Sequence, residues 1–295
     1  MLYVGAYDSN LYALDAKTGK FLWKYPTEGG IGSSPWVDGE RVFVGSQDRS
    51  LYAVNARTGR LLWTFPTRGP IYSSPRTQLG YVFFGSDDHR LYVLNALNGR
   101  KAWAFEAEGP IRSSPALGEE AIYFGDEVGS VYALSAEGRL RWRFRARRGV
   151  TSSPCVGEGL LFVGSKDWHL YALDLTAGWA VWRYRTGGPV VSSPTTDGSA
   201  VYFGSADRRV YALNVENGEV LWRYETEGQV TSSPRVHDGA VYVGSTDGHL
   251  YALDAKTGRL RWRFPTEGPI VSTPCIADGI LYVGSCDHRI YALQV

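Results

Sequence analysis

The sequence predicts an all-β protein, a β-propeller of four-stranded antiparallel blades, from three observations. Tryptophans recur at steps of 39 or 40 residues, at Trp23, Trp63, Trp103, Trp142, Trp182, Trp222 and Trp262. The element "SSP" or "STP" keeps the same steps, ending at Pro35, Pro75, Pro115, Pro154, Pro194, Pro234 and Pro274. No segment shows helical periodicity over ten residues or more. The repeats fill the chain and predict a single domain over residues 1–295.

Each repeat is expected to form four short strands, called A to D in chain order. In one repeat, residues 230–236 predict strand A, and the following Asp238–Gly239 suits a tight hairpin turn. Residues 240–245, "AVYVGS", predict strand B, and residues 249–255, "HLYALDA", predict strand C. The "KTG" turn places a glycine where φ must be positive. Residues 259–266, "RLRWRFPT", predict strand D.

The number of blades follows from the way the chain begins and ends. Residues 2–14 and 281–293 have nearly the same sequence, so there are eight B–C hairpins but seven A and seven D strands. We favour eight blades, with strand A missing from the first and strand D from the last. Seven blades are the alternative, and one hairpin would then be displaced. Either arrangement leaves two unpaired strand edges, which favour self-association.

Composition bounds the function only broadly. Hydrophobic residues make up 44% and charged residues 21% of the chain, which is typical of a globular protein. A formal net charge of +1 favours neither nucleic acid nor an anionic membrane as partner. No apolar run could span a bilayer, and the N-terminus lacks the pattern of a signal peptide. The compartment is therefore undetermined, and it would be the cytoplasm if the chain is complete.

Cysteine usage does not suggest a disulfide framework. Cys155 and Cys275 occupy the same place in two repeats 120 residues apart, and Cys286 has no equivalent. Equivalent positions of distant repeats should not meet, so reduced thiols are expected.

The repeat also carries a family resemblance. Residues 251–262, "YALDAKTGRLRW", and residues 13–23, "ALDAKTGKFLW", resemble the tryptophan-docking repeat of the PQQ-like propellers. The family includes quinoprotein dehydrogenases, bacterial outer-membrane assembly factors of the BamB type, and sensor domains of some bacterial protein kinases. The resemblance implies eight blades, and it implies that each tryptophan covers the neighbouring blade as part of the scaffold.

The resemblance leaves three functions open. A non-catalytic scaffold that binds a protein or another ligand fits the short loops best. A PQQ-binding sensor domain of a larger signalling protein, such as a Ser/Thr kinase, is the alternative. A quinoprotein dehydrogenase comes third, because the adjacent cysteines and long inserted loops of those enzymes are missing here. We therefore expect no catalytic residue and no resident cofactor, with PQQ possible only by resemblance.

A candidate ligand-binding face is predicted where the B–C and D–A loops emerge together. Its B–C tips gather arginine and histidine residues, which would attract carboxylates, phosphates or acidic peptide. They are Arg49, His89, Arg90, His169, Arg208, Arg209, His249, His288 and Arg289. The tip aspartates are expected to cap their own turns rather than bind a metal ion.

Blade 4 departs from the repeat. Its B–C tip reads "GDEVGS", with Asp126 in the place of the usual serine, Glu127 at a variable position and Val128 in the place of the usual aspartate. Strand A of this blade carries Arg112, and the next D–A loop carries Arg147 and Arg148. Acids beside arginines predict a specialised pocket here, whereas drift among the repeats is the simpler explanation.

Overall fold

The computed structural model describes residues 1–295 and contains strands and turns only. The chain divides into two compact units, Met1–Arg145 and Ala146–Val295. No helix in it is long and apolar enough to cross a membrane. Each unit contains four antiparallel sheets, and each sheet is one blade of the propeller.

Unit 1 contains blades 1 to 4. Its strands are β1 (Leu2–Gly5), β2 (Asn10–Leu14), β3 (Phe21–Pro26), β4 (Trp36–Asp38), β5 (Arg41–Gly45), β6 (Ser50–Asn55), β7 (Leu61–Pro66), β8 (Arg76–Gln78), β9 (Tyr81–Gly85), β10 (Arg90–Asn95), β11 (Lys101–Glu106), β12 (Ala116–Leu117), β13 (Ile122–Gly125), β14 (Ser130–Leu134) and β15 (Leu140–Arg145).

Unit 2 contains blades 5 to 8. Its strands are β16 (Cys155–Gly157), β17 (Leu160–Gly164), β18 (His169–Asp174), β19 (Ala180–Arg185), β20 (Thr195–Thr196), β21 (Ala200–Ser205), β22 (Arg209–Asn214), β23 (Val220–Glu225), β24 (Arg235–His237), β25 (Ala240–Gly244), β26 (His249–Asp254), β27 (Leu260–Pro265), β28 (Cys275–Ala277), β29 (Ile280–Gly284) and β30 (Ile290–Gln294).

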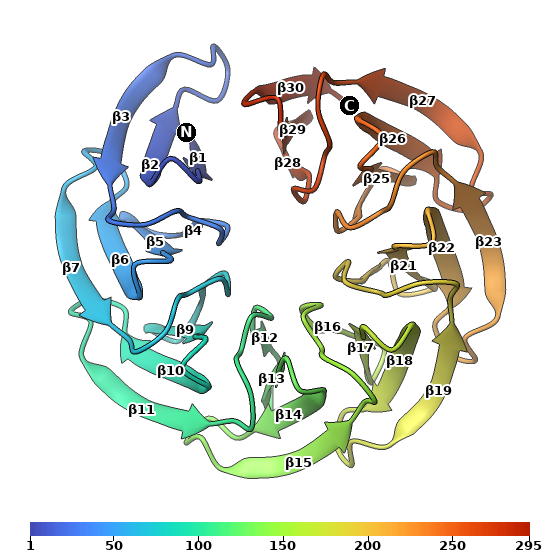
Figure 1. The fold of residues 1–295 in the computed structure, drawn as a ribbon, viewed down its shortest axis with the longest axis horizontal. Helices are drawn as coiled ribbons and strands as arrows, with labels where there is room; N and C mark the ends of the chain where they lie inside the picture. The colour runs from blue at the N-terminus through green and yellow to red at the C-terminus, as the bar shows by residue number, and fades with distance from the viewer. The chain divides into compact units, whose positions relative to one another are not determined.

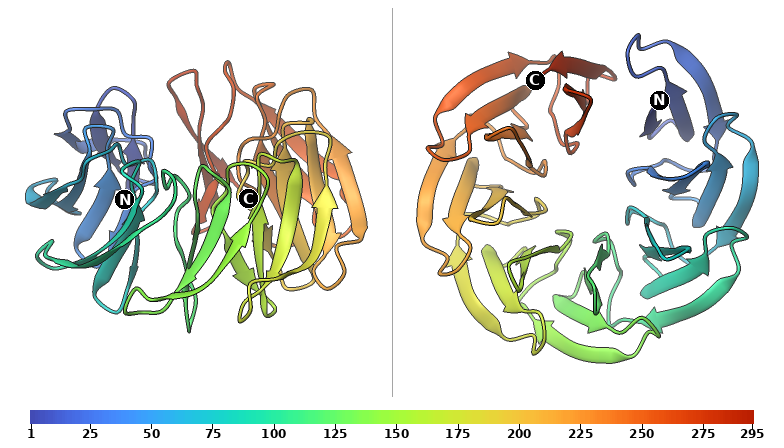
Figure 2. Two further views of the ribbon diagram at one scale, coloured as in Figure 1. Left: turned by 60° about the horizontal axis from the view of Figure 1, so that its bottom comes forward. Right: turned by 180° about the vertical axis from the view of Figure 1, so that it is seen from behind.

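The sheets confirm the β-propeller and the count of eight blades. Six sheets have four strands in the order A-B-C-D, whereas β1–β3 lacks strand A and β28–β30 lacks strand D. Within each unit, successive blades follow one another in chain order, with strand D on the outer side (Figure 1). The side and rear views show the same order within each unit (Figure 2).

Strand A is shorter than the sequence predicts. We expected it to include the "SSP" element, but it begins only after the proline, as in β24. The proline has no N–H to donate to a sheet. The preceding serines hydrogen-bond elsewhere: the Ser232 hydroxyl accepts from the amide of Gly244 in strand B, at 3.2 Å. The element is therefore an anchor for strand A and not part of its ladder.

The predicted turns are confirmed by their backbone angles. In the A–B turns, Asp238 and Gly239 have φ values of 46° and 68°, so both residues are left-handed. Two left-handed central residues are typical of a type I′ hairpin turn, whose twist matches that of the flanking strands. In the C–D turn, Gly258 has a φ of 69°, as expected for "KTG".

Within each unit, the tryptophans dock one blade onto the next. The indole N–H of Trp63 donates to the carbonyl of Ala96 in the following blade, at 3.2 Å. Its ring lies against Gly99, where an added Cβ would come within 2.7 Å of the ring. Trp222 repeats this geometry with Ala255 and Gly258 in unit 2. These contacts confirm the predicted scaffold role. Any residue larger than glycine at Gly99 or Gly258 would displace the indole ring.

The core lies between the faces of adjacent blades. In unit 1, Phe43 and Leu51 of blade 2 form one buried cluster with Phe84 and Leu94 of blade 3. Strand C is buried along most of its length, as in β10. Burial from both neighbours explains why strand C reads as a nearly continuous apolar run.

Candidate functional site

The B–C tips and the D–A loops form one surface in each unit, here called the loop face. The tips are residues 6–9, 46–49, 86–89, 126–129, 165–168, 205–208, 245–248 and 285–288, and the loops are residues 27–31, 67–71, 107–111, 146–150, 186–190, 226–230 and 266–270. The backbone N–H of Glu28 donates to the Asp48 carboxylate at 2.9 Å, and Gly187 donates likewise to Asp207 at 2.7 Å. Each such bond ties a D–A loop to the tip of the next blade.

An aspartate at the third residue of the tip caps every tip except that of blade 4. In blade 3, the Asp88 carboxylate accepts hydrogen bonds from the Arg90 amide at 3.2 Å and from the Tyr92 hydroxyl at 2.7 Å. The same two bonds occur at every tip with such an aspartate, namely Asp8, Asp48, Asp88, Asp167, Asp207, Asp247 and Asp287. The predicted capping role is confirmed.

The tyrosine partner was missed, although its spacing in "DxxxY" repeats in the sequence. Burial, followed by the hydrogen bond to Asp88, raises the pKa of Tyr92 to about 12. Donation from the Tyr12 hydroxyl is the main cause that lowers the pKa of Asp8. The tip phenols therefore stay protonated near neutral pH.

The residue at the apex of most tips has a left-handed backbone. These residues have φ values between 68° and 74°, and they are Ser9, Arg49, His89, Trp168, Arg208 and His288. Glycines Gly129 and Gly248 occupy the apex in the other two tips. A left-handed conformation is uncommon for residues other than glycine, and it was not predicted. It leaves the side chains of Arg49, His89, Arg208 and His288 exposed.

About half of the predicted cations on the loop face are already paired. Arg90 and Arg209 each pair with a strand D glutamate at 3.2 Å, and Arg289 pairs with Glu267 at 2.9 Å. Arg208 lies 3.9 Å from Glu225. The Nδ1 atoms of His169 and His249 lie 3.2 Å from the tip aspartates Asp167 and Asp247. The predicted cations without an ion pair are Arg49, His89, Arg147, Arg148 and His288.

In blade 4, the structure brings Arg112 and Glu127 together and adds two residues from blade 3. The Arg112 guanidinium donates to both carboxylate oxygens of Asp87, at 2.8 Å to Oδ2 and 3.0 Å to Oδ1. It lies 3.5 Å from Glu127 and 4.7 Å from the centre of the Tyr72 ring. The hydrogen bond to Asp87 is the main cause that raises the pKa of Arg112. Asp87 and Tyr72 gave no signal in the sequence, because their positions vary among the repeats.

Asp126 does not face this cluster. Its side chain is fully buried, and its carboxylate accepts from the Ser130 amide at 2.7 Å and from the Tyr132 hydroxyl at 2.9 Å. It therefore caps the tip in place of the missing aspartate at position 128. Arg147 and Arg148 belong to unit 2, where the Arg147 amide donates to Asp167 at 2.9 Å.

The geometry can be compared with known proteins. A family model described as the outer membrane protein assembly factor BamB matches residues 7–143, 127–236 and 225–295, which together cover nearly the whole chain. The chain belongs to the BamB family of PQQ-repeat propellers. The comparison with curated proteins gave no match.

Two solved structures share this BamB-family fold. BamB from Moraxella catarrhalis is 22% identical, with a TM-score of 0.86, and the match covers 99% of this chain and 93% of that one. The computationally designed Ika8 protein is 16% identical, with a TM-score of 0.89 and coverages of 99% and 92%. At these identities the two similarities establish the fold alone.

The serines of this BamB-family chain are committed to the scaffold. The hydroxyl of the first serine in the "SSP" element bonds to strand B, as Ser33 does with Gly45 at 2.9 Å. The hydroxyl of the second accepts from the previous blade, as Ser74 does from the Ser34 amide at 2.9 Å. The cysteines Cys155, Cys275 and Cys286 form no disulfide, as predicted.

Proposed function

We propose that this BamB-family propeller is a non-catalytic scaffold that binds a protein partner through its loop face. The observation that supports this most is a set of exposed basic side chains there that form no ion pair, namely Arg49, Arg68 and His89 in unit 1 and Arg147, Arg148 and His288 in unit 2. Exposed cations held on short, hydrogen-bonded loops favour an acidic surface as partner. The name of the matching family, an assembly factor, points in the same direction.

The proposal includes no resident PQQ and no quinoprotein chemistry. PQQ carries several carboxylates and would need cations that are free to hold them. Arg112 lies just before β12, and its guanidinium is already shared between Asp87 and Glu127. The sequence contains no adjacent cysteine pair. These two observations support a scaffold without resident PQQ.

Site-specific photo-crosslinking in the source organism tests the scaffold proposal. A photoreactive amino acid placed at Arg49, His89 or Arg148 samples the loop face, and the same residue at Lys20 or Arg60 samples the C–D turns as a matched control. We expect a discrete protein adduct, identified by mass spectrometry, from the loop-face positions only. Equal adducts from both sets of positions, or none from the loop face, would contradict the proposal.

The cofactor part has its own test. Addition of PQQ and Ca²⁺ should leave both the PQQ absorbance spectrum and the melting temperature of the protein unchanged. A spectral shift with thermal stabilisation would instead favour the sensor domain, and PQQ-dependent dye reduction with an alcohol substrate would favour the dehydrogenase.

Edge association is a narrower part of the proposal. In the 295-residue chain, β1 pairs only with β2 and β30 pairs only with β29. Free edges of this kind can pair with a second copy. Sedimentation at high protein concentration should then show dimers or larger species, and a monomer throughout would contradict this part.

A further inference from the structure

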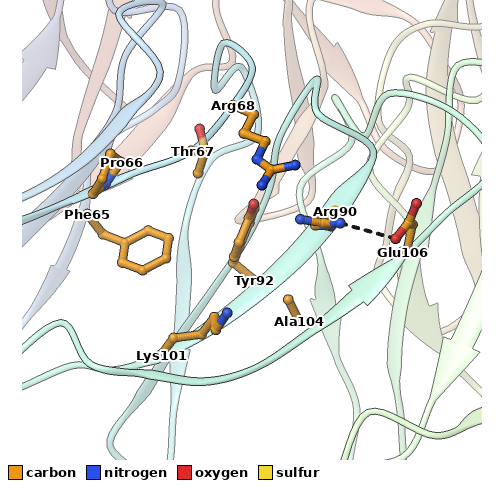
Figure 3. Close-up of a pocket in the computed structure, with 9 residues that line it drawn as sticks. All are labelled: Phe65, Pro66, Thr67, Arg68, Arg90, Tyr92, Lys101, Ala104 and Glu106. Atoms are coloured by element: carbon orange, nitrogen blue, oxygen red, sulfur yellow. Dashed lines mark hydrogen bonds and ion pairs between the residues drawn. The ribbon is translucent and has the colours of Figure 1, made fainter.

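A polar cavity of about 510 Å³ lies between blades 2 and 3 of unit 1 (Figure 3). One wall is the end of β7 with the D–A loop that follows it, and the other is formed by β10 and β11. The lining residues are Phe65, Pro66, Thr67, Arg68, Arg90, Tyr92, Lys101, Ala104 and Glu106. We call it the Arg68 pocket.

At most of the other junctions the position equivalent to Arg68 holds a carboxylate, and at the remaining two it holds Arg147 or Gly187. The residue equivalent to Arg68 is a glutamate at four of the seven junctions, at Glu28, Glu108, Glu227 and Glu267. Glu108 pairs with Arg143 and, at 2.6 Å, with Arg145 of the following blade. In unit 2, Glu267 pairs with Arg289 at 2.9 Å. At these junctions, a carboxylate in the D–A loop thus forms ion pairs with arginines of the following blade.

The Arg68 pocket lacks that internal carboxylate and presents a cation instead. Arg90 is paired with Glu106 at 3.2 Å, but neither the Arg68 guanidinium nor the Lys101 ammonium forms an ion pair. Three cations and one carboxylate leave the lining with a net charge of two positive. In Figure 3, the Arg68 side chain points toward Arg90 and Tyr92, and Lys101 lies below Tyr92.

Two further substitutions make room in this pocket. Ala104 is smaller than every equivalent strand D residue, which are Lys24, Thr64, Arg143, Arg183, Arg223 and Arg263. Lys101 occupies a position that is apolar in the other blades, at Phe21, Leu61, Leu140, Ala180, Val220 and Leu260. The pocket therefore gains both volume and positive charge relative to its own repeat.

We propose that the Arg68 pocket binds an external ligand that carries at least two carboxylates. Arginine and lysine side chains bind carboxylates through charge-assisted hydrogen bonds, which are among the stronger ones in proteins. The volume lies in the range of about 300–1,000 Å³ that is usual for small-ligand sites. The ligand's carboxylates would occupy the role that Glu108 fills at the next junction. Arg68 lies in a D–A loop of the loop face, so an acidic protein segment in this pocket would rest on the protein-binding proposal, whereas binding of a free polycarboxylate would stand whether or not the loop face binds a protein.

Calorimetry on the full chain tests the proposal with two probes at constant ionic strength. Citrate represents a free polycarboxylate, and a blocked peptide of alternating Asp and Glu represents an acidic protein segment. Binding of either probe at one site, weakened at least about tenfold by Arg68→Glu, would support the proposal, and the probe that binds identifies the source of the carboxylates. Ala104→Arg should weaken binding as well, because it refills the space as Arg143 does in blade 4.

Arg60→Glu is the matched control, since it makes the same charge change on a C–D turn outside the pocket. It should leave the affinity unchanged. Arg68→Glu is expected to fold, because glutamate is the residue at four equivalent junctions, and its melting temperature checks this directly. Absence of binding by both probes, or equal weakening by Arg60→Glu and Arg68→Glu, would overturn the proposal.

Discussion

In the tips of blades 3 and 4, a carboxylate accepts hydrogen bonds from the same kinds of donor, but the carboxylate comes from different positions in the repeat. In blade 3, Asp88 accepts from the Arg90 amide, the Tyr92 hydroxyl and, at 2.9 Å, the amide of Arg68 in the preceding loop. One side chain thus joins the tip, strand C and the neighbouring blade.

In blade 4, Val128 stands where Asp88 would be, and Asp126 supplies the carboxylate from two residues earlier. It accepts from Ser130 and Tyr132, but it does not accept from the preceding loop. The amide of Glu108 in that loop donates instead to the Tyr132 hydroxyl, at 3.0 Å. The comparison shows that every tip needs an acceptor for its strand C amide and its tyrosine hydroxyl, whereas the aspartate that supplies this acceptor can occupy either of two positions.

The largest expected effect comes from removal of the buried carboxylate. Asp126→Ala should lower the free energy of unfolding by about 3 kcal/mol, because it leaves the buried Tyr132 hydroxyl and the Ser130 amide without their acceptor. Asp88→Ala should cost about 2 kcal/mol, since its partners lie nearer to water. Urea denaturation measures both losses.

Asp38→Ala is the control for this pair, because Asp38 is exposed at the end of β4. Its effect should stay within about 0.5 kcal/mol. If Asp126→Ala destabilised the chain no more than this control, Asp126 would not be the capping residue of blade 4.

An intermediate effect is expected at alkaline pH, where the tip tyrosines differ from free phenols. The folded chain holds the Tyr92 proton up to a pKa of about 12, and burial also raises the pKa of Tyr132. In the unfolded chain a tyrosine loses its proton near pH 10, so above that pH the folded state binds more protons than the unfolded state. The free energy of unfolding should therefore fall as the pH rises from 10 toward 12.

Urea midpoints measured between pH 8 and 12 check this expectation. Tyr92→Phe removes one of the titrating groups, so the decline of its midpoint with pH should be shallower than that of the wild type, even though its stability at pH 8 is lower. A parallel decline in both proteins would show that Tyr92 does not contribute.

The parts of the fold that depend on backbone period could be predicted from the sequence. The eight B–C hairpins predicted eight blades, and Trp63 lies on Gly99 as the repeated tryptophan predicts. The positive φ of Gly258 and the capping by Asp88 were also predictable, because turn chemistry is local.

Contacts between neighbouring blades were not predictable in the same way. The Arg112–Asp87 pair joins residues 25 positions apart, and nothing in the repeat distinguishes Asp87 from Gln47 or Lys166 at the same place. The Arg68 pocket likewise depends on residues from two blades. Such sites arise where the repeats differ, whereas the repeat pattern predicts only the features that all repeats have in common.

The smallest effect, and the sharpest test of the comparison, is expected when the blade 4 tip is rebuilt on the blade 3 pattern. The double variant Asp126→Ser/Val128→Asp places serine and aspartate where blade 3 has Ser86 and Asp88. The new carboxylate at 128 should accept from the Ser130 amide, the Tyr132 hydroxyl and the Glu108 amide, as Asp88 does from its three donors. The loss in free energy of unfolding should then stay below about 1 kcal/mol, whereas Asp126→Ser alone should lose about 3 kcal/mol. Equal losses in the single and double variants would mean that the acceptor cannot move between the two positions, and that blade 4 has a tip of its own kind.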